Sequence, residues 1–567
     1  MDSIKQNISE AIAKVLEMDK EQVKQNIEKP KMSNMGDFAY PCFRLASVLK
    51  KAPPVIANEI KEKLDKIEGV SKIEVVAGYI NFFADNAKVA ESVVSDIIKE
   101  GVACYNLDEG NGKIICIDYS SPNIAKPFHI GHLRSTVIGA ALVKIYKAMG
   151  YNVIGINHLG DFGTQFGYVI EGYKRFGHDY DLSTEPIKKL VEIYVKINEM
   201  AKEDETIVEA ARKNFSLLEA GDTETVALWE KFRSLSLEEY KKIYDILGVK
   251  FDSYNGEAFY NDKMDEIVEI LTAKDKLVES EGAKVVELET EKVPCMILKT
   301  NGSTTYATRD LAAILYRART YDYTKNIYLT GYEQILHFKQ IFETAKYIVD
   351  EKYTKGLVHV PFGMVLGPGG KKLSTRKGAS TTIKDVIDEA VDKAYLVLES
   401  KGKTGKEAEE IASKVGIGAI IFNDLKNNRI KDEIFDLDEM LKFEGETGPY
   451  VQYTYVRTNS IMKKANVKLN IQDVDLSKLQ AKEEIDLIKL LANRKNVLKE
   501  AAEGQEPSIL TRYIIDVASS FSKYYNECQI IVDDEQLKHA RLALVKATGY
   551  VLKCGLDMLG INAPEKM

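Results

Sequence analysis

Residues 114–132 read IICIDYSSPNIAKPFHIGH and join an apolar strand to a loop and the start of a helix. Residues 114–117 have the apolar, β-branched character of a buried strand. The helix that follows keeps one face apolar through the repeat Leu133, Val137, Ala141 and Ile145. The sequence NVIGINHLG at residues 152–160 supplies the next strand. A strand, a helix and a second strand in this order predict a βαβ unit, and therefore an α/β fold with a mainly parallel sheet.

The chain of 567 residues is long enough for about three or four domains. We expect an α+β unit over residues 1–108 and the α/β domain over residues 109–382. A charge-rich helical segment at about 185–245 looks inserted into the α/β domain. Helical periodicity dominates residues 383–567, which predicts a C-terminal all-helical domain.

Strand-like segments occur both before and after the βαβ unit. The first unit contains a predicted loop at residues 29–46 and a predicted pair of strands at 72–78 and 79–84. Further strand-like segments in the α/β domain are residues 283–290, 294–300, 326–332 and 358–366. Their alternation with helical segments extends the prediction of a parallel sheet.

Composition excludes several classes of protein. Apolar residues make up 45% and charged residues 29%, which is the balance of a folded globular protein. No apolar run approaches the roughly 18 residues of a membrane span, and charges interrupt the N-terminal segment, so we expect a cytoplasmic protein without a secretory signal. The net charge of −8 means that any nucleic-acid surface must be a local basic patch. Six scattered cysteines without a CxxC pair predict reduced, buried thiols and no zinc site.

The loop before the first βαβ helix is a predicted nucleotide site. Free N–H groups and the positive end of the helix dipole favour phosphate there. Gly131 has no side chain, so a base or ribose can lie against the backbone. His129 and His132 can donate hydrogen bonds to phosphate oxygens as charge shifts during a displacement.

A second cationic loop, GPGGKKLSTRKG at residues 367–378, complements the first. Its glycines permit motion, and Lys372 and Ser374 are predicted to hold a leaving pyrophosphate, with Arg376 and Lys377 adding positive charge. Such a run alone is more often a solvated basic hairpin, but the histidine loop upstream favours the phosphate-binding interpretation. The similar letters at residues 31–34, KMSN, precede the βαβ unit and are interpreted as a loop of the N-terminal unit.

The order HIGH followed by a KMSK-like loop resembles the class I aminoacyl-tRNA synthetases. Five further stretches narrow the resemblance to the arginyl-tRNA synthetase family and cover the chain nearly end to end. They are SSPNIAKPFHIGHLRST (120–136), GDFGTQFG (160–167), TTYATRDLAA (304–313), TGPYVQYTYVR (447–457) and the closing APEKM. The resemblance implies a Rossmann-like catalytic domain, an additional N-terminal domain that contacts the tRNA elbow, and a helical anticodon-binding domain.

The same resemblance implies the reaction and its partners. Arginine is activated by ATP to arginyl-adenylate and then transferred to tRNA(Arg), with release of pyrophosphate and AMP. Mg²⁺ is expected to accompany ATP, and a monomer is the family default.

The second lysine of KMSK is Thr375 here, and we hypothesise that Lys126 supplies the missing charge from the histidine loop. A purely structural role for Lys126 is the alternative.

An arginine site needs carboxylates placed to receive the five donors of a guanidinium group. Asp310 matches the guanidinium carboxylate of the family, and Tyr306, four residues earlier, shares its face if the segment is helical. The resemblance also implies that the α-amino and carboxylate end of arginine is held by Asn123, His129 and Gln334. Asp118 and Glu257 are further acidic candidates, although each could instead be a surface or capping residue.

Candidate tRNA contacts come from aromatic residues, because unpaired bases stack on aromatic faces. In the helical domain the candidates are Tyr450, Tyr453, Arg457, Tyr525 and Met567. Any single one of these aromatic residues is more often part of a core. In the N-terminal unit Asn81 is the candidate for a base contact.

Three alternatives remain open. The HxGH loop also occurs in nucleotidyltransferases that make cofactors, but these are usually far shorter and lack a helical RNA-binding domain. Another class I synthetase specificity is disfavoured by Tyr306 and Asp310. A binding protein derived from a synthetase that has lost catalysis is disfavoured by the intact His129, His132 and Lys372.

Overall fold

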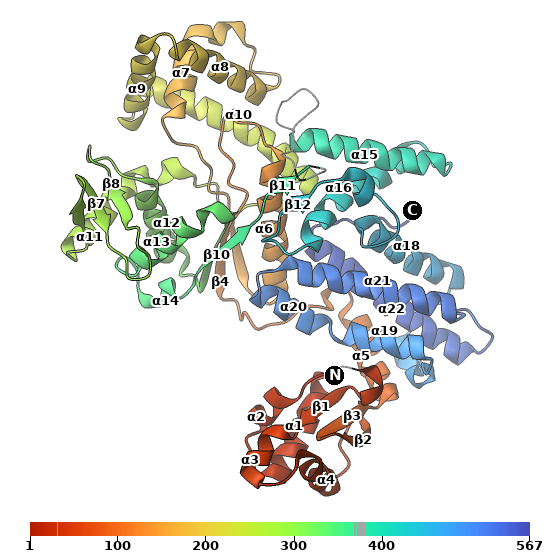
Figure 1. Cartoon of the computed structure of the whole chain (residues 1–567). Helices are drawn as coiled ribbons and strands as arrows, with labels where there is room; N and C mark the ends of the chain where they lie inside the picture. The colour runs from red at the N-terminus through yellow and green to blue at the C-terminus, as the bar shows by residue number, and fades with distance from the viewer. Residues whose placement is uncertain (31, 368–369, 371–381) are drawn as a thin grey trace.

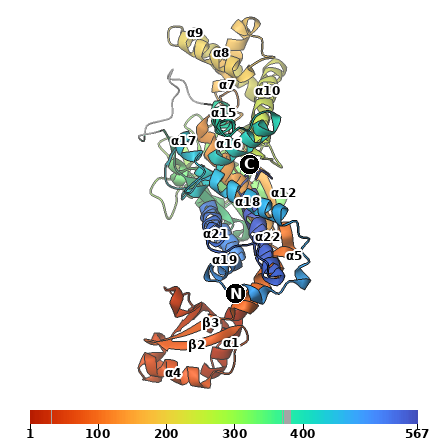
Figure 2. The ribbon, with the colours of Figure 1, turned by 90° about the vertical axis from the view of Figure 1, so that its right-hand side faces the viewer.

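The computed structural model describes residues 1–30, 32–367, 370 and 382–567. Figure 1 shows an N-terminal unit, a central α/β part with a protruding group of helices, and a C-terminal helical part. Figure 2 shows the N-terminal unit at one end of the molecule and the protruding helices at the other. The predicted phosphate-binding residues Lys372 and Ser374, with Thr375, Arg376 and Lys377, lie outside the described residues.

The N-terminal unit packs helices against a small antiparallel sheet with the strand order β1-β3-β2. Its elements are α1 (Asp2–Leu16), α2 (Lys20–Asn26), β1 (Phe38–Pro41), α3 (Ala46–Leu49), α4 (Pro53–Lys63), β2 (Val70–Val76), β3 (Tyr79–Ala84) and α5 (Asn86–Glu100). The two predicted strands are present. The predicted loop at 29–46 is wrong at residues 38–41, because pairing of Phe38 with Phe82 makes β1 a strand and no local periodicity announces it.

The central sheet is parallel and has the strand order β10-β9-β4-β5. Its strands are β4 (Ile114–Asp118), β5 (Asn152–Ile156), β9 (Lys325–Gly331) and β10 (Leu357–Phe362). Helix α6 (Ile130–Ala148) connects β4 to β5, so the predicted βαβ unit and parallel sheet are confirmed. Four further helices lie between β5 and β10 in the chain: α11 (Met264–Ala273), α12 (Tyr306–Tyr321), α13 (Ile335–Ala345) and α14 (Glu351–Thr354).

Two of the predicted strands are not in the parallel sheet. Residues 283–290 and 294–300 contribute to a separate antiparallel sheet of β6 (Val278–Ser280), β7 (Ala283–Val286) and β8 (Cys295–Leu298). Periodicity identifies a strand but not its partner, which explains the error. The protruding helices follow β5 and are α7 (Gln165–Phe176), α8 (Pro186–Ala201), α9 (Glu205–Glu219) and α10 (Thr223–Leu247).

The C-terminal part is helical, as predicted. Its helices are α15 (Ile383–Ser400), α16 (Lys406–Lys426), α17 (Leu437–Met440), α18 (Gly448–Ala465), α19 (Lys482–Ala492), α20 (Arg494–Glu503), α21 (Pro507–Glu527) and α22 (Glu535–Met558). One short strand, β12 (Glu433–Ile434), pairs in parallel with β11 (Val365–Leu366). The pairing ties the chain before residue 367 to the helical part.

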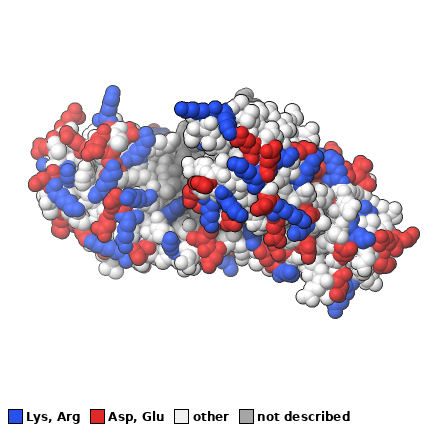
Figure 3. Space-filling model, turned by 90° about the horizontal axis from the view of Figure 1, so that it is seen from below, with Lys and Arg blue, Asp and Glu red and all other residues white. Residues whose placement is uncertain are grey.

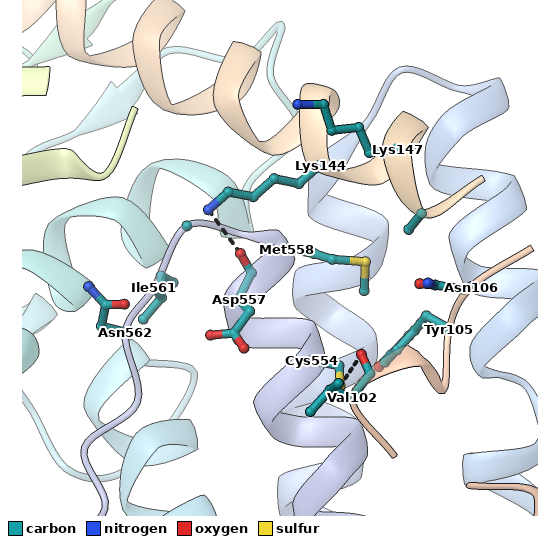
Figure 4. Close-up of a pocket in the computed structure, with 12 residues that line it drawn as sticks. Val102, Tyr105, Asn106, Lys144, Lys147, Cys554, Asp557, Met558, Ile561 and Asn562 are labelled. Carbon is teal, nitrogen blue, oxygen red and sulfur yellow. Dashed lines mark hydrogen bonds between the residues drawn. The ribbon is translucent and has the colours of Figure 1, made fainter. Parts of the chain in front are cut away.

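The three parts are held together at a common junction. Glu100 at the end of α5 accepts from Arg494 at 2.9 Å, and Lys144 of α6 donates to the main-chain oxygen of Asp557 at 3.0 Å. Figure 4 shows Lys144 directed at that oxygen, beside a cavity of about 520 Å³. All six cysteines are buried free thiols, among them Cys554 at this junction.

No helix in the described part of the chain is long and apolar enough to cross a bilayer. Within those same residues no cluster of three or more His, Cys, Asp or Glu side chains is arranged to hold a metal ion. On the face in Figure 3, basic and acidic side chains are interspersed.

A buried ion pair connects α6 to the helical part. The Arg134 side chain is fully buried, its Nε lies 3.4 Å from Asp424 Oδ1, and its Nη1 donates to the main-chain oxygen of Lys431 at 2.7 Å. Burial raises the pKa of the Asp424 carboxyl, and the nearby guanidinium opposes that shift. The pair therefore depends on both charges being present.

We expect Asp424→Ala to lower the free energy of unfolding by about 3–5 kcal/mol, because Arg134 would be left as an unpaired buried charge. Urea-induced unfolding followed by circular dichroism measures the change. The matched control is Asp388→Ala, which removes an exposed ion pair with Lys384 and should change stability by less than about 0.5 kcal/mol. Equal effects of the two substitutions would contradict the expectation.

Candidate active site

The loop between β4 and α6 is strained and firmly held. Ser120, Ser121 and Ala125 have φ angles of 69°, 45° and 56°, a region that non-glycine residues rarely adopt. Each such residue costs of the order of 1–3 kcal/mol and persists only where its surroundings fix it. Here α6 helps to fix the loop, because the Ser120 N–H donates to Ser135 Oγ at 2.9 Å and the Ser120 hydroxyl bonds Thr136 at 2.8 Å.

His129 and His132 lie together at the start of α6. Their rings stack with centroids 3.9 Å apart, and the Gly131 N–H donates to His129 Nδ1 at 3.0 Å. Because Nδ1 accepts this bond, the proton of neutral His129 is assigned to Nε2, which is then a donor. The pKa of His132 is lowered to about 3, mainly by burial and to a lesser extent by the charges of His129 and Lys126. The pKa of His129 is also lowered, mainly by burial and then by the charge of Lys126. Both rings are therefore neutral hydrogen-bond donors at pH 7.

Two residues at the start of α15 contact this loop directly. Thr382 forms a β-bridge with His129, and the Ile383 N–H donates to the main-chain oxygen of Phe128 at 3.0 Å. Thr382 is also the N-cap of α15. Thr382 and Ile383 are thus neighbours of the histidine loop, whereas Lys372 and Ser374 are not described.

A cavity of about 440 Å³ opens beside the carboxyl ends of β4 and β9. Six of the seven predicted arginine-binding residues line this cavity. They are Asp118, Asn123, Glu257, Tyr306, Asp310 and Gln334. The seventh, His129, is not among the lining residues. These six residues come from four separate stretches of sequence, which the fold brings to one place.

Helix α12 presents Tyr306 and Asp310 to the cavity. Thr305 caps the helix, so Tyr306 begins it and Asp310 follows one turn later on the same face. Asp310 Oδ2 lies 2.6 Å from His337 Nε2 of α13, which leaves Oδ1 without a partner among the described residues. Tyr306 is 64% exposed, so a ligand can cover it.

Asp118 differs from the other carboxylates of the cavity. Its Oδ2 accepts from the buried Arg317 at 2.7 Å and its Oδ1 accepts from Ser121 at 2.9 Å. Both oxygens already have internal partners, and the charge is balanced by Arg317. A direct contact between Asp118 and a ligand stays a prediction.

The position of Asn123 depends on a close approach between two loops. The Ile124 N–H donates to the main-chain oxygen of Gly160 at 3.1 Å, and a β-carbon at Gly160 would lie 1.9 Å from Asn123 Oδ1. Only glycine leaves room for the amide there. The first glycine of the GDFG stretch therefore sets one wall of the cavity.

Glu257 is the carboxylate whose charge is most sensitive to its surroundings. Burial raises its pKa to about 7, the nearby Arg309 lowers it, and Asp310 and Asp161 raise it again. Its carboxylate lies 3.5 Å from Arg309, and Oε2 has no hydrogen-bond partner among the described residues. Oε2 is buried, so a cationic ligand in the cavity would meet the part of the side chain that stays exposed, which is 17% of its surface.

Several lining residues were not predicted from the sequence. They are Ser121, His158, Gly160, Arg309, Tyr328, Thr330, His337 and Phe338. A signal existed for two of them: Arg309 directly precedes Asp310, and His337 follows Gln334 by three residues, the spacing of one helical face. Tyr328 and Thr330 belong to β9, Ser121, His158 and Gly160 to the loops after β4 and β5, and Phe338 to α13. The sequence does not reveal the strand order that brings these segments together.

The predicted tRNA-facing residues have very different exposures. In the helical part the Arg457 guanidinium lies 4.9 Å from the ring centroids of both Tyr453 and Tyr525, which are 40% and 42% exposed. Tyr450 and Met567 are half-buried. Asn81, by contrast, is 3% exposed in the middle strand of its sheet, and this burial argues against the predicted base contact.

Comparison with known protein families gives the class. Residues 93–437 match the model of the class I tRNA synthetase (R) catalytic domain, and residues 451–567 match the DALR anticodon binding domain. Residues 2–84 match the arginyl tRNA synthetase N-terminal domain. The catalytic part is therefore that of a class I aminoacyl-tRNA synthetase.

Individual relatives give the particular family. Proteins named arginine–tRNA ligase from Clostridium botulinum and Clostridium beijerinckii are 49% and 48% identical over 99% of this chain and 100% of their own. The solved arginyl-tRNA synthetase of Thermus thermophilus has a TM-score of 0.83 at 24% identity over 99% of both chains. That of Plasmodium falciparum has a TM-score of 0.82 at 25% identity over 100% of this chain and 99% of the other. The chain belongs to the arginyl-tRNA synthetase family.

We expect the affinity for arginine to rise with pH through about 7, where Glu257 ionises. Below that pH the carboxyl is protonated and attracts a cation less, so affinity falls by up to about tenfold per pH unit. Titrating the protein with arginine between about pH 6 and pH 8 measures the slope. In Glu257→Gln the dependence should flatten, and an unchanged slope in that variant would refute the assignment.

Proposed function

We propose that this chain is an arginine–tRNA ligase that works in two steps. The carboxylate of arginine attacks the α-phosphate of ATP in line, giving arginyl-adenylate and pyrophosphate. The terminal ribose of tRNA(Arg) then takes the arginyl group, and AMP leaves. No protein side chain need form a covalent bond, since positioning and charge stabilisation are sufficient for both displacements.

The observation that carries the proposal is an acidic cavity beside a helix N-terminus. Asp310 and Glu257 give the cavity the charge that a guanidinium or ammonium group requires, while the loop that supplies Asn123 leads to the positive end of the α6 dipole and its two neutral histidines. A cation site and a phosphate site side by side are what the condensation of arginine with ATP needs.

The roles of individual residues follow from this geometry. For the guanidinium group we propose Asp310 with Tyr306, and for the α-amino and carboxylate end Asn123 and Gln334 with Glu257. His129, Gly131 and His132 would contact ATP, and Lys372 and Ser374 would act from the second loop. Mg²⁺ would accompany the phosphates, which supply most of its ligands in such sites.

The tRNA would contact three regions of the chain. The exposed stack of Tyr453, Arg457 and Tyr525 suits an unpaired anticodon base, because aromatic and guanidinium planes both stack on bases. Tyr450 and Met567 would flank that site. The N-terminal unit would contact the tRNA elbow. We further propose that the enzyme acts as a monomer in the cytoplasm.

A cavity next to the arginine cavity is the proposed binding site for the end of the tRNA. It has about 520 Å³ and shares Tyr306 and Arg309 with the arginine cavity. Phe162 and Phe215, with ring centroids 5.3 Å apart, offer stacking surface, and Lys299 offers a positive charge. A terminal nucleoside bound there would approach the activated arginine.

Arginine-dependent exchange between ATP and pyrophosphate, measured with and without tRNA(Arg), tests the proposed reaction. We expect exchange that requires arginine and is not supported by lysine or other amino acids. Absence of exchange under both conditions would favour a binding protein without catalysis. Exchange that depends on another amino acid would favour another class I specificity.

Lys126 is expected to act in the activation step. It is exposed on the histidine loop, and its charge lowers the pKa of both His129 and His132, so it lies close to the proposed phosphates. We expect Lys126→Ala to slow arginine activation by at least about tenfold, or roughly 1.4 kcal/mol of barrier. The exposed Lys242→Ala is the matched control. A loss below about threefold would leave Lys126 with a structural role only.

A further inference from the structure

Glu257 reaches the arginine cavity from a segment that packs against the end of β5. The segment precedes the 3-10 helix η5 (Glu257–Lys263). Ser253 bridges Ile156, and the Glu257 N–H donates to the main-chain oxygen of Leu159 at 2.9 Å. These bonds hold Ser253 and the Glu257 N–H against the chain at the end of β5. They do not hold Gly256 and Ala258, the residues on either side of Glu257.

The Asp161 carboxylate holds the residues on both sides of Glu257. Asp161 Oδ1 accepts from the Ala258 N–H at 2.9 Å. A β-carbon at Gly256 would lie 2.5 Å from the same carboxylate, so the backbone at residue 256 rests directly on it. The Asp161 side chain is 2% exposed, and it is not among the lining residues of the arginine cavity.

Arg233 of the protruding helix α10 completes the arrangement. Its Nε donates to Asp161 Oδ2 at 2.9 Å, and its Nη2 donates to the main-chain oxygen of Tyr254 at 2.9 Å. Trp229, one turn earlier, donates its indole N–H to the main-chain oxygen of Asp161 at 2.6 Å. Arg233 therefore bridges Asp161 to the segment that carries Glu257, and it too lies outside the cavity lining.

We infer that Asp161 and Arg233 are positioning residues that set the affinity for arginine by fixing Glu257 in the cavity. The inference rests on the proposed function, because it requires that Glu257 contact arginine. Neither residue touches the substrate, and their contribution passes through Glu257. The helices that protrude from the α/β part thereby take part in amino-acid recognition.

The same arrangement affects the charge of Glu257. Four groups face its carboxylate: Arg309, Asp310, Asp161 and the Phe162 N–H. Arg233 balances the negative charge of Asp161. Without Arg233, the uncompensated Asp161 would raise the pKa of Glu257 further, and the rise of arginine affinity with pH would move to higher pH.

The test compares Arg233→Met, Glu257→Gln and the double variant in the full-length enzyme with tRNA present. For Arg233→Met we expect the KM for arginine to rise at least about tenfold while the KM for ATP stays within about twofold. In the Glu257→Gln background the same substitution should change the KM for arginine by less than about twofold, because the residue it positions has lost its charge. If the two substitutions instead multiply their effects on the KM for arginine in the double variant, the inference is overturned.

A matched control separates positioning from general stability. Arg175→Met removes another ion pair of the same protruding helices, the one between Arg175 and Glu171 at 2.6 Å, and should leave the KM for arginine unchanged. Arg233→Lys keeps the charge but lacks the planar fork that reaches both acceptors in this geometry, so it should give an intermediate KM with an unshifted pH dependence. A shift in that pH dependence equal to that of Arg233→Met would also count against the inference.

The outcomes distinguish this inference from the proposed function. If Glu257→Gln leaves the KM for arginine unchanged, Glu257 does not contact arginine, and its proposed role and the positioning inference both fail, while arginine-dependent exchange still tests the ligase function. If Glu257→Gln raises the KM but Arg233→Met does not, only the positioning inference is overturned. Trp229 is the single tryptophan of the chain, so its fluorescence gives an independent arginine titration at this contact.

Discussion

One hydrogen-bonding face of α10 holds the catalytic loops in place. Tyr240 Oη lies 2.7 Å from the main-chain oxygens of both Asn123 and Lys126, and Ser236 accepts from the Ala125 N–H at 3.0 Å. Tyr244 bonds Ser120 and accepts from Asn157, both at 2.9 Å. The three side chains of α10 are buried, as are Ser120, Ala125 and Asn157, and buried polar groups are costly to leave unpaired. The strained turn between β4 and α6 therefore persists because a helix from a distant part of the sequence satisfies it.

The substrate sites divide the charge of the reactants between them. Asp310 and Glu257 would provide negative charge to the proposed guanidinium and α-amino groups, and burial keeps His129 and His132 neutral beside the proposed phosphates. Neutral donors stabilise developing negative charge without holding the product pyrophosphate as tightly as fixed cations would. Positive charge is instead available from the exposed Lys126, whose long side chain can move with the phosphates.

The sequence predicts the parts of the site that are local and fails on those that depend on long-range packing. The family resemblance implies Asp310 and Asn123, helical spacing places Tyr306 on the face of Asp310, and the structure brings all three to one cavity. Arg233 and Asp161 are 72 residues apart, and no sequence pattern links them. Asn81 shows a second kind of failure. The sequence suggests an accessible polar residue, but long-range strand pairing buries it in the central strand of its sheet.

Arg134 has a consequence for where the catalytic unit ends. Its guanidinium belongs to the helix that carries the histidine motif, yet its partners Asp424 and Lys431 lie beyond the point where helical periodicity takes over. The family model of the catalytic domain also extends to residue 437. A fragment cut at the apparent border near residue 383 would lack both Asp424 and the Lys431 carbonyl, so Arg134 would lose these partners. The autonomous folding unit thus includes the first helices of the C-terminal part, whatever their secondary structure suggests.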